Sequence, residues 1–144
     1  MAASQLAIGQ LVAVQAEQQG GRIRAQKISV RRAVIGSIDS LTEDGAIVLG
    51  QQVRIPGGAR LADARGGVVQ KAGLRKGDRV AVSGFRRPEG EIEATRIEVG
   101  LPPGTDLVRG VAQEPRAGGF RIGDLDVDLC GVFLSTNNGD SLRN

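Results

Sequence analysis

Two pieces of this chain repeat each other, and the repeat is out of phase with the order in which a complete unit would run. Residues 9–14 read Gly-Gln-Leu-Val-Ala-Val, and residues 77–82 read Gly-Asp-Arg-Val-Ala-Val. A few positions later, residues 21–28 match residues 90–97, and the turn between the two matched pieces is one residue longer in the second copy. A repeat of this kind indicates one supersecondary unit that the fold uses more than once.

A second and weaker similarity, which needs a gap, joins the middle of the chain to its C-terminal part. Residues 36–39 and 44–50 resemble residues 110–113 and 118–123. The two similarities are complementary, because the first covers the back half of a unit and the second covers the front half. The chain therefore reads as a back half, a complete unit and a front half.

This order divides the chain into a complete unit at 33–99, two half-units at 6–30 and 105–134, and a tail at 135–144. Two arrangements of the half-units remain open. They pair into a second, permuted barrel, within one chain or by exchange between two chains, or each is a fragment of a longer array. We expect the second barrel, because pairing leaves fewer open strand edges, which are aggregation hazards.

The hydrophobic residues recur with the period of a β-strand and not with that of a helix. Asp44-Gly45 is a strong hairpin signal, and Ile28 and Ile97 break the alternation at equivalent positions, which indicates a bulge in each copy. The predicted fold is all-β, with two small antiparallel OB-like β-barrels of about five or six strands each. The second barrel is the one formed by the N- and C-terminal half-units.

Glycine limits the other elements. The segment 59–69 is the only candidate helix, and Gly66-Gly67 restricts it to one or two turns that would close the end of a barrel. Glycines at tight bends are expected to be structural, so that Gly45→Val or Gly90→Val should destabilise the fold. These positions are Gly36, Gly45, Gly50, Gly77, Gly84 and Gly90.

The composition of the 144 residues argues against enzyme chemistry. The chain has no His, Trp or Tyr, three Phe and a single Cys, so it lacks the commonest general base and the usual zinc ligands. Cys130 has no neighbouring base or cation in the sequence to form a thiolate, and a buried structural thiol is expected. We predict no catalytic residue, no cofactor and no transmembrane segment.

The net charge is +3, and almost all of the basic residues are arginines. On a small barrel, neighbouring loops could gather basic residues into a strip for phosphates, although aromatic stacking platforms are scarce here. Without a functional role, these residues would form a solvated basic surface. With one, they would bind an acidic protein, an anionic polysaccharide or a nucleic acid. The candidate ligand-binding residues are Arg31, Arg32, Arg75, Lys76, Arg79, Phe85, Arg86 and Arg87.

Asp124, Asp126 and Asp128 alternate along one stretch of chain, so on a strand they would point to the same face. Three carboxylates of this kind are a weak candidate for a hard cation such as Ca²⁺. The EF-hand pattern fails, because Leu129 stands where that loop needs glycine. We expect a half-buried strand with Leu125, Val127 and Leu129 inward and the acids in water.

The middle unit resembles a known family through its glycines and β-branched residues. The pattern is Gly36-x-Ile38, Asp44-Gly45-x-Ile47-x-Leu49, Val53-x-Ile55, Leu74-x-x-Gly77-Asp78-x-Val80-x-Val82-x-Gly84 and Gly90-x-Ile92-x-Ala94-x-x-Ile97. It is similar to the bacterial domain-of-unknown-function family 5666, although the insertion after Pro56 is longer than expected. The resemblance implies OB-like barrels, often in tandem in exported or envelope proteins, with no agreed activity and no catalytic residues to transfer.

The expected function is therefore a non-enzymatic barrel module for binding or assembly, with a protein partner or self-association. The alternative is OB-type binding of single-stranded nucleic acid or another polyanion through the arginine-rich loops. Residues 1–8 lack the basic and long apolar regions of an intact signal peptide. That leaves a cytoplasmic protein or a mature exported one, and the family resemblance implies the periplasm or cell envelope.

Overall fold

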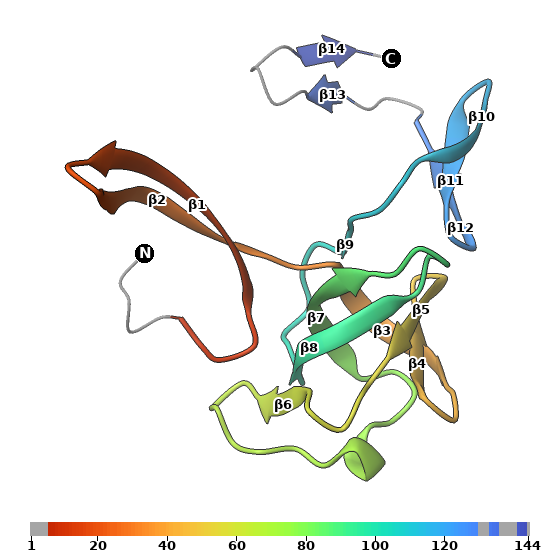
Figure 1. Cartoon of the computed structure of the whole chain (residues 1–144). Coiled ribbons are helices and arrows are strands. Elements are labelled where there is room, and N and C mark those ends of the chain that lie inside the picture. The colour runs from red at the N-terminus through yellow and green to blue at the C-terminus, as the bar shows by residue number, and fades with distance from the viewer. Residues whose placement is uncertain (1–5, 130–132, 136–140, 144) are drawn as a thin grey trace.

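The computed structural model describes residues 6–129, 133–135 and 141–143, and the side chains of residues 6–129 (Figure 1). The predicted all-β class is confirmed, and no helix among the described residues is long and apolar enough to cross a membrane. The strands are β1 (Leu11–Gln19), β2 (Arg22–Arg31), β3 (Val34–Leu41), β4 (Gly45–Val48), β5 (Gln51–Arg54), β6 (Arg60–Asp63), β7 (Arg79–Arg86), β8 (Ile92–Val99), β9 (Leu107–Val108), β10 (Gln113–Arg116), β11 (Gly119–Ile122), β12 (Leu125–Asp128), β13 (Phe133–Ser135) and β14 (Ser141–Arg143).

Five strands of the middle unit close a small barrel in the order β3-β4-β5-β8-β7, with β7 returning to β3. The predicted barrel is confirmed. Its pairs are antiparallel except that β5 and β8 run parallel, because the chain crosses the end of the barrel between β5 and β7. Two further strands pair at stretches that the five leave open: β6 runs parallel to the C-terminal half of β8, and β9 pairs antiparallel with the start of β3.

The crossing segment is not the helix predicted at 59–69. β6 instead pairs in parallel with the C-terminal half of β8, and the only helical piece described there is the 3₁₀ turn η2 (Lys71–Gly73). The Gly66-Gly67 pair lies in a tight turn after β6, where Asp63 accepts hydrogen bonds from the amides of Arg65 and Gly67. Pairing with β8 has overridden a weak helix propensity.

The hydrophobic core lies inside the barrel. Thirteen residues form one cluster, and Val34 and Ile92 are 0% exposed. The cluster is made of Ala33, Val34, Ile38, Ala46, Val48, Val53, Ile55, Leu74, Val80, Val82, Ile92, Ala94 and Ile97. Most of these are the β-branched residues that pack well on a pleated surface.

Gly45 and Gly90 are structural for different reasons. A Cβ on Gly45 would lie 2.0 Å from the Val53 carbonyl oxygen, so the tight approach of β4 to β5 requires glycine there. Gly90 has open space around it but a φ of +100°, which side chains rarely adopt.

The two half-units do not form a second barrel within the chain. β1 and β2 make a two-stranded sheet, β10, β11 and β12 make a three-stranded sheet, and no backbone pairing joins these two sheets among the described residues. The prediction of a second barrel is therefore corrected for a single copy. The physical reason is that the two sheets extend from different sides of the barrel, each anchored to it separately (Figure 1).

Each anchor is a small set of polar contacts with the barrel. On the N-terminal side, the Thr95 hydroxyl donates to the Gly9 carbonyl, and Arg96 Nη1 donates to the Ile8 carbonyl at 3.2 Å. On the C-terminal side, Gln51 Nε2 donates to the Ile122 carbonyl at 2.7 Å, and Gln51 itself is 1% exposed.

Candidate binding surfaces

The β1–β2 hairpin has the same pairing register as the β7–β8 hairpin of the barrel. Val14 pairs with Ile28 as Val82 pairs with Ile97, and in both hairpins the register shifts at the next residue or two, at Gln15/Ala16 and at Ser83/Gly84. The bulge predicted from the repeated break at Ile28 and Ile97 is present in both copies. The hairpin is thus built as the back half of a barrel.

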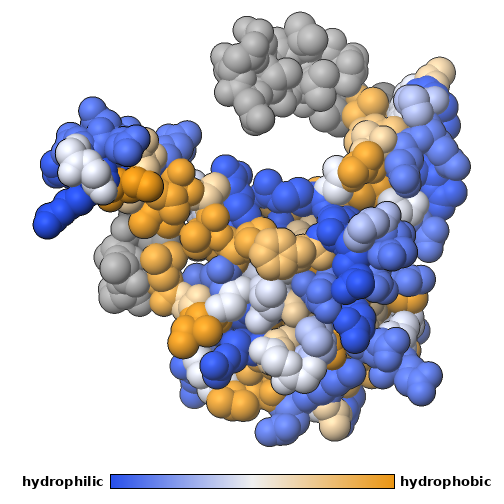
Figure 2. All heavy atoms as spheres, viewed as in Figure 1, coloured by the Kyte–Doolittle hydropathy of each residue, from blue (hydrophilic) through white to orange (hydrophobic). Residues whose placement is uncertain are grey.

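The same side chains are buried in the barrel and exposed in the hairpin. Val80, Val82 and Ile92 are 1%, 1% and 0% exposed, whereas their counterparts Val12, Val14 and Ile23 are 41%, 50% and 75% exposed. Hydrophobic residues accordingly run along the projecting hairpin (Figure 2). We call these three counterparts the hairpin patch. A contiguous exposed apolar patch marks an interaction surface.

The three-stranded sheet has the register of the front half of the barrel. Gly119 pairs with Asp128 and Phe120 with Val127, as Gly45 pairs with Arg54 and Ala46 with Val53. Phe120, Val127 and Leu129 are only half-buried, although their counterparts Ala46, Val53 and Ile55 belong to the core; Ile122 is buried. This sheet therefore shares the register of β4 and β5 but leaves part of its apolar side uncovered.

The stretch equivalent to β3 is interrupted in this part of the chain. In the barrel, β3 is continuous, and its residues from Val34 to Ser37 pair with β7. The equivalent stretch near the C-terminal side is divided into β9 and β10, and residues 109–112 between them belong to no strand. Val111 in this gap is 72% exposed.

A cavity of about 400 Å³ lies between the barrel and the three-stranded sheet. The β5 start, the β7–β8 turn and the β11–β12 turn line it, with Gln51, Arg86 and Arg87 among the lining residues. Arg86 does not offer its guanidinium to the cavity as a free cation, because it donates to the carbonyls of Gly90 at 2.7 Å and Arg109 at 2.8 Å. Burial lowers the pKa of Arg86.

Most of the predicted basic strip makes contacts within the chain. Arg32 forms an ion pair with Glu98 at 2.8 Å, and Arg79 pairs with Asp106. Arg75 donates to the carbonyls of Ala72 and Leu74 in the loop before β7. Arg31, Arg75 and Lys76 are exposed.

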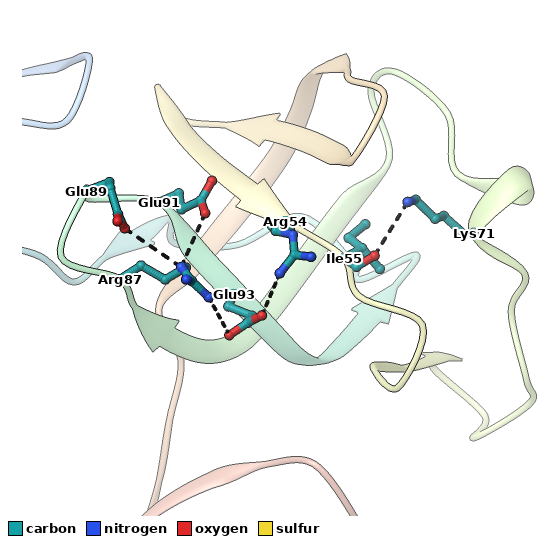
Figure 3. A network of polar contacts seen from close by, with 7 residues as sticks. All are labelled: Arg54, Ile55, Lys71, Arg87, Glu89, Glu91 and Glu93. Carbon is teal, nitrogen blue, oxygen red and sulfur yellow. Dashed lines mark hydrogen bonds and ion pairs between the residues drawn. The ribbon is translucent and has the colours of Figure 1, made fainter.

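Arg87 is the centre of an acidic network at the β7–β8 turn. It lies 3.8, 3.5 and 3.3 Å from Glu89, Glu91 and Glu93, and Glu93 also pairs with Arg54 at 2.7 Å (Figure 3). Nearby, Lys71 Nζ donates to the Ile55 carbonyl. Of the predicted strip, the structure brings together Arg86 and Arg87 at the cavity, with Phe85 beside them and 58% exposed.

Of the three aspartates, Asp126 and Asp128 lie on β12, and Asp124 lies in the turn before it. Arg121 approaches Asp124 at 3.8 Å and Asp126 at 3.4 Å, and Arg116 approaches Asp126 at 3.5 Å. The described part of the chain contains no group of three or more acidic, His or Cys residues that could hold a metal. Cys130 lies outside the described residues.

The sequence contains no signal for the buried role of Gln51. An amide in a strand reads as a solvent-facing residue, yet its Nε2 donates to the Leu49 and Ile122 carbonyls from a buried position. The hairpin patch, by contrast, could have been found. Its residues match core residues of the complete unit one by one in the sequence.

Together these features define a small closed β-barrel domain that carries two incomplete sheets. Residues 35–98, which span the barrel strands, match the family described as "Domain of unknown function (DUF5666)". The match confirms, for residues 35–98, the resemblance drawn from the glycines and β-branched residues of the middle unit. Comparisons with curated proteins and with solved structures found no match.

Proposed function

We propose that the protein is a non-enzymatic assembly module of the bacterial cell envelope, which binds a protein partner through its two incomplete sheets. One observation carries this proposal. The β1–β2 hairpin keeps the register and bulge of a barrel hairpin, but its inward-facing residues are exposed. A chain that supplied the missing strands would bury them.

Strand physics supports a protein as the ligand. An isolated two-stranded hairpin is at best marginally stable in water, so β1–β2 gains stability from any further strand. Its open edge offers backbone donors and acceptors that a partner strand can pair. The exposed valines and isoleucine of the hairpin patch would then add side-chain specificity on alternate residues.

The location in the envelope rests on the family resemblance. Fractionation of cells that produce the full-length protein would test it. We expect to find the protein in the periplasmic or membrane fraction. Recovery in the cytosol alone would contradict the location but would leave the binding proposal unaffected.

Binding of single-stranded nucleic acid or another polyanion is the alternative. Phe85 favours it, because this phenylalanine is exposed beside Arg86 on an OB-like barrel and stacking on such platforms is a recurring mode. The ion pairs of Arg32, Arg79 and Arg87 weigh against it, because a phosphate would compete with carboxylates already in place. An oligonucleotide titration at two salt concentrations separates the alternatives, since phosphate contacts weaken steeply with salt.

The proposal is tested with three forms of the full chain as immobilised bait for a bacterial envelope extract. The wild type is compared with Ile23→Asp and with Val68→Asp, a control at an 85% exposed valine outside both half-units. We expect proteins that resist a high-salt wash to be retained by the wild type and by Val68→Asp and lost from Ile23→Asp. Equal retention by all three, or retention of no protein by any of them, a second copy of the chain included, would refute binding through the hairpin.

A further inference from the structure

We propose that the partner is a second copy of this chain, so that β1–β2 of one copy and residues 107–129 of another close a composite barrel. This inference rests on the proposed function, because it names the occupant of the same surfaces. The second barrel predicted from the sequence would then form between two copies of the chain and not within a single copy.

The strand pairing expected between two copies follows from the pairing within the complete barrel. There, β7 pairs with the first half of β3, and β8 runs parallel to β5. The counterparts of β7, β8 and β5 are β1, β2 and β12, which keep the same internal register, and the counterpart of β3 is the divided stretch β9–β10. Transferring the partners Val34↔Val82, Gly36↔Val80 and Val53↔Ile92 places Val108 beside Val14, Gly110 beside Val12 and Val127 beside Ile23 of the other copy.

The composite pairing fills the observed gap in the strands. Residues 109–112 are outside any strand, and they are the positions whose counterparts in β3 need β7 as a neighbour. β1 of a second copy is the equivalent of β7. Its addition would make the stretch from β9 to β10 a continuous strand like β3, and it would cover the hairpin patch.

Charge complementarity favours this occupant. In the barrel, Arg54 on β5 pairs with Glu93 on β8 at 2.7 Å. The counterparts are Asp128 on β12 and Arg24 on β2, so the pair is kept with its signs reversed. The N-terminal half-unit at 6–30 has three basic residues and one acid, whereas the half-unit at 105–134 has three basic residues and five acids.

One copy cannot readily satisfy both of its own half-units. The hairpin is anchored near Thr95 and the three-stranded sheet at Gln51, and the two extend from different sides of the barrel (Figure 1). A hairpin that meets the sheet of another copy is a heterologous contact. Such contacts close when two or more copies exchange their halves and otherwise give an open chain.

Disulfide trapping between two single-cysteine variants tests the register. Both full-length variants carry Cys130→Ser, one also carries Ile23→Cys and the other Val127→Cys. These positions correspond to directly paired core residues of the barrel, and neighbouring strands bring Cα atoms within the disulfide range. After mixing and oxidation, we expect a linked pair of chains at twice the 15.0 kDa chain mass.

Two controls make the result specific. Val68→Cys replaces Ile23→Cys as an equally accessible thiol away from the interface, and Arg22→Cys places the thiol on the opposite face of β2. Neither should link to Val127→Cys. A product as abundant with Val68→Cys as with Ile23→Cys, or no product at all, would overturn the composite barrel.

Disulfide trapping and the bait experiment together distinguish a failure of the composite barrel from a failure of the proposed function. If trapping fails while Ile23→Asp still loses envelope proteins that the wild type retains, the partner is another protein and the assembly function stands. If trapping fails and Ile23→Asp binds as the wild type does, both proposals are refuted.

Discussion

Ile23 and Ile92 are equivalent residues in two copies of one hairpin, but substitution by alanine should lower the unfolding free energy much more at Ile92 than at Ile23. Ile92 is 0% exposed in the core, so Ile92→Ala removes buried methyl and methylene groups and leaves a cavity. Substitutions of this kind cost about 2–5 kcal/mol. A domain of this size has a total stability of roughly 3–10 kcal/mol at about 0.05–0.15 kcal/mol per residue, so the loss is a large part of the total.

Ile23 is 75% exposed in one copy, so Ile23→Ala should change the unfolding free energy by no more than about 0.5 kcal/mol when the protein is dilute. Urea unfolding followed by far-ultraviolet circular dichroism measures both variants. At high protein concentration the cost of Ile23→Ala should rise, because association buries the side chain. Equal costs for both variants in dilute solution would refute the claim that the hairpin is an uncovered copy of a core element.

Two further substitutions test the barrel and its contact with the three-stranded sheet. Gly45→Val should destabilise the barrel by about 1–3 kcal/mol in thermal or urea unfolding through overpacking against β5, and Gly58→Val, where a Cβ meets nothing within 4 Å, should not; a stable Gly45→Val variant would contradict the tight approach. Gln51→Met should raise amide hydrogen exchange in β11 and β12 about tenfold or more, because two buried carbonyls lose their donor and 1.4 kcal/mol corresponds to a factor of ten. Gln52→Met, on the exposed face, should leave the exchange unchanged. Unchanged exchange in Gln51→Met would contradict the role of Gln51 and show that other contacts hold the sheet.

The all-β class and the barrel could be predicted because their signals are local. Alternation, glycine punctuation and the Asp44-Gly45 turn each act within a few residues. The bulge was predictable for the same reason, since a break in alternation recurs at Ile28 and Ile97. The segment at 59–69 was mispredicted because its strand depends on pairing with β8, more than thirty residues away along the chain.

The arrangement of the half-units could be predicted only in part. Matching sequences identify complementary halves, but they do not say whether the halves meet within one copy or between two. That depends on the anchors at Thr95 and Gln51, which are polar contacts over long sequence separations. The same limit applies to the arginines, whose sequence pattern indicates a phosphate strip but whose side chains pair with distant carboxylates such as Glu98 and Asp106.

The molar mass in solution, measured by light scattering over a wide range of protein concentration, tests assembly most directly. We expect a mass that rises from 15.0 kDa toward multiples of that value as the concentration increases, while Ile23→Asp remains at 15.0 kDa and folded. A wild-type mass of 15.0 kDa at every concentration would contradict the composite barrel.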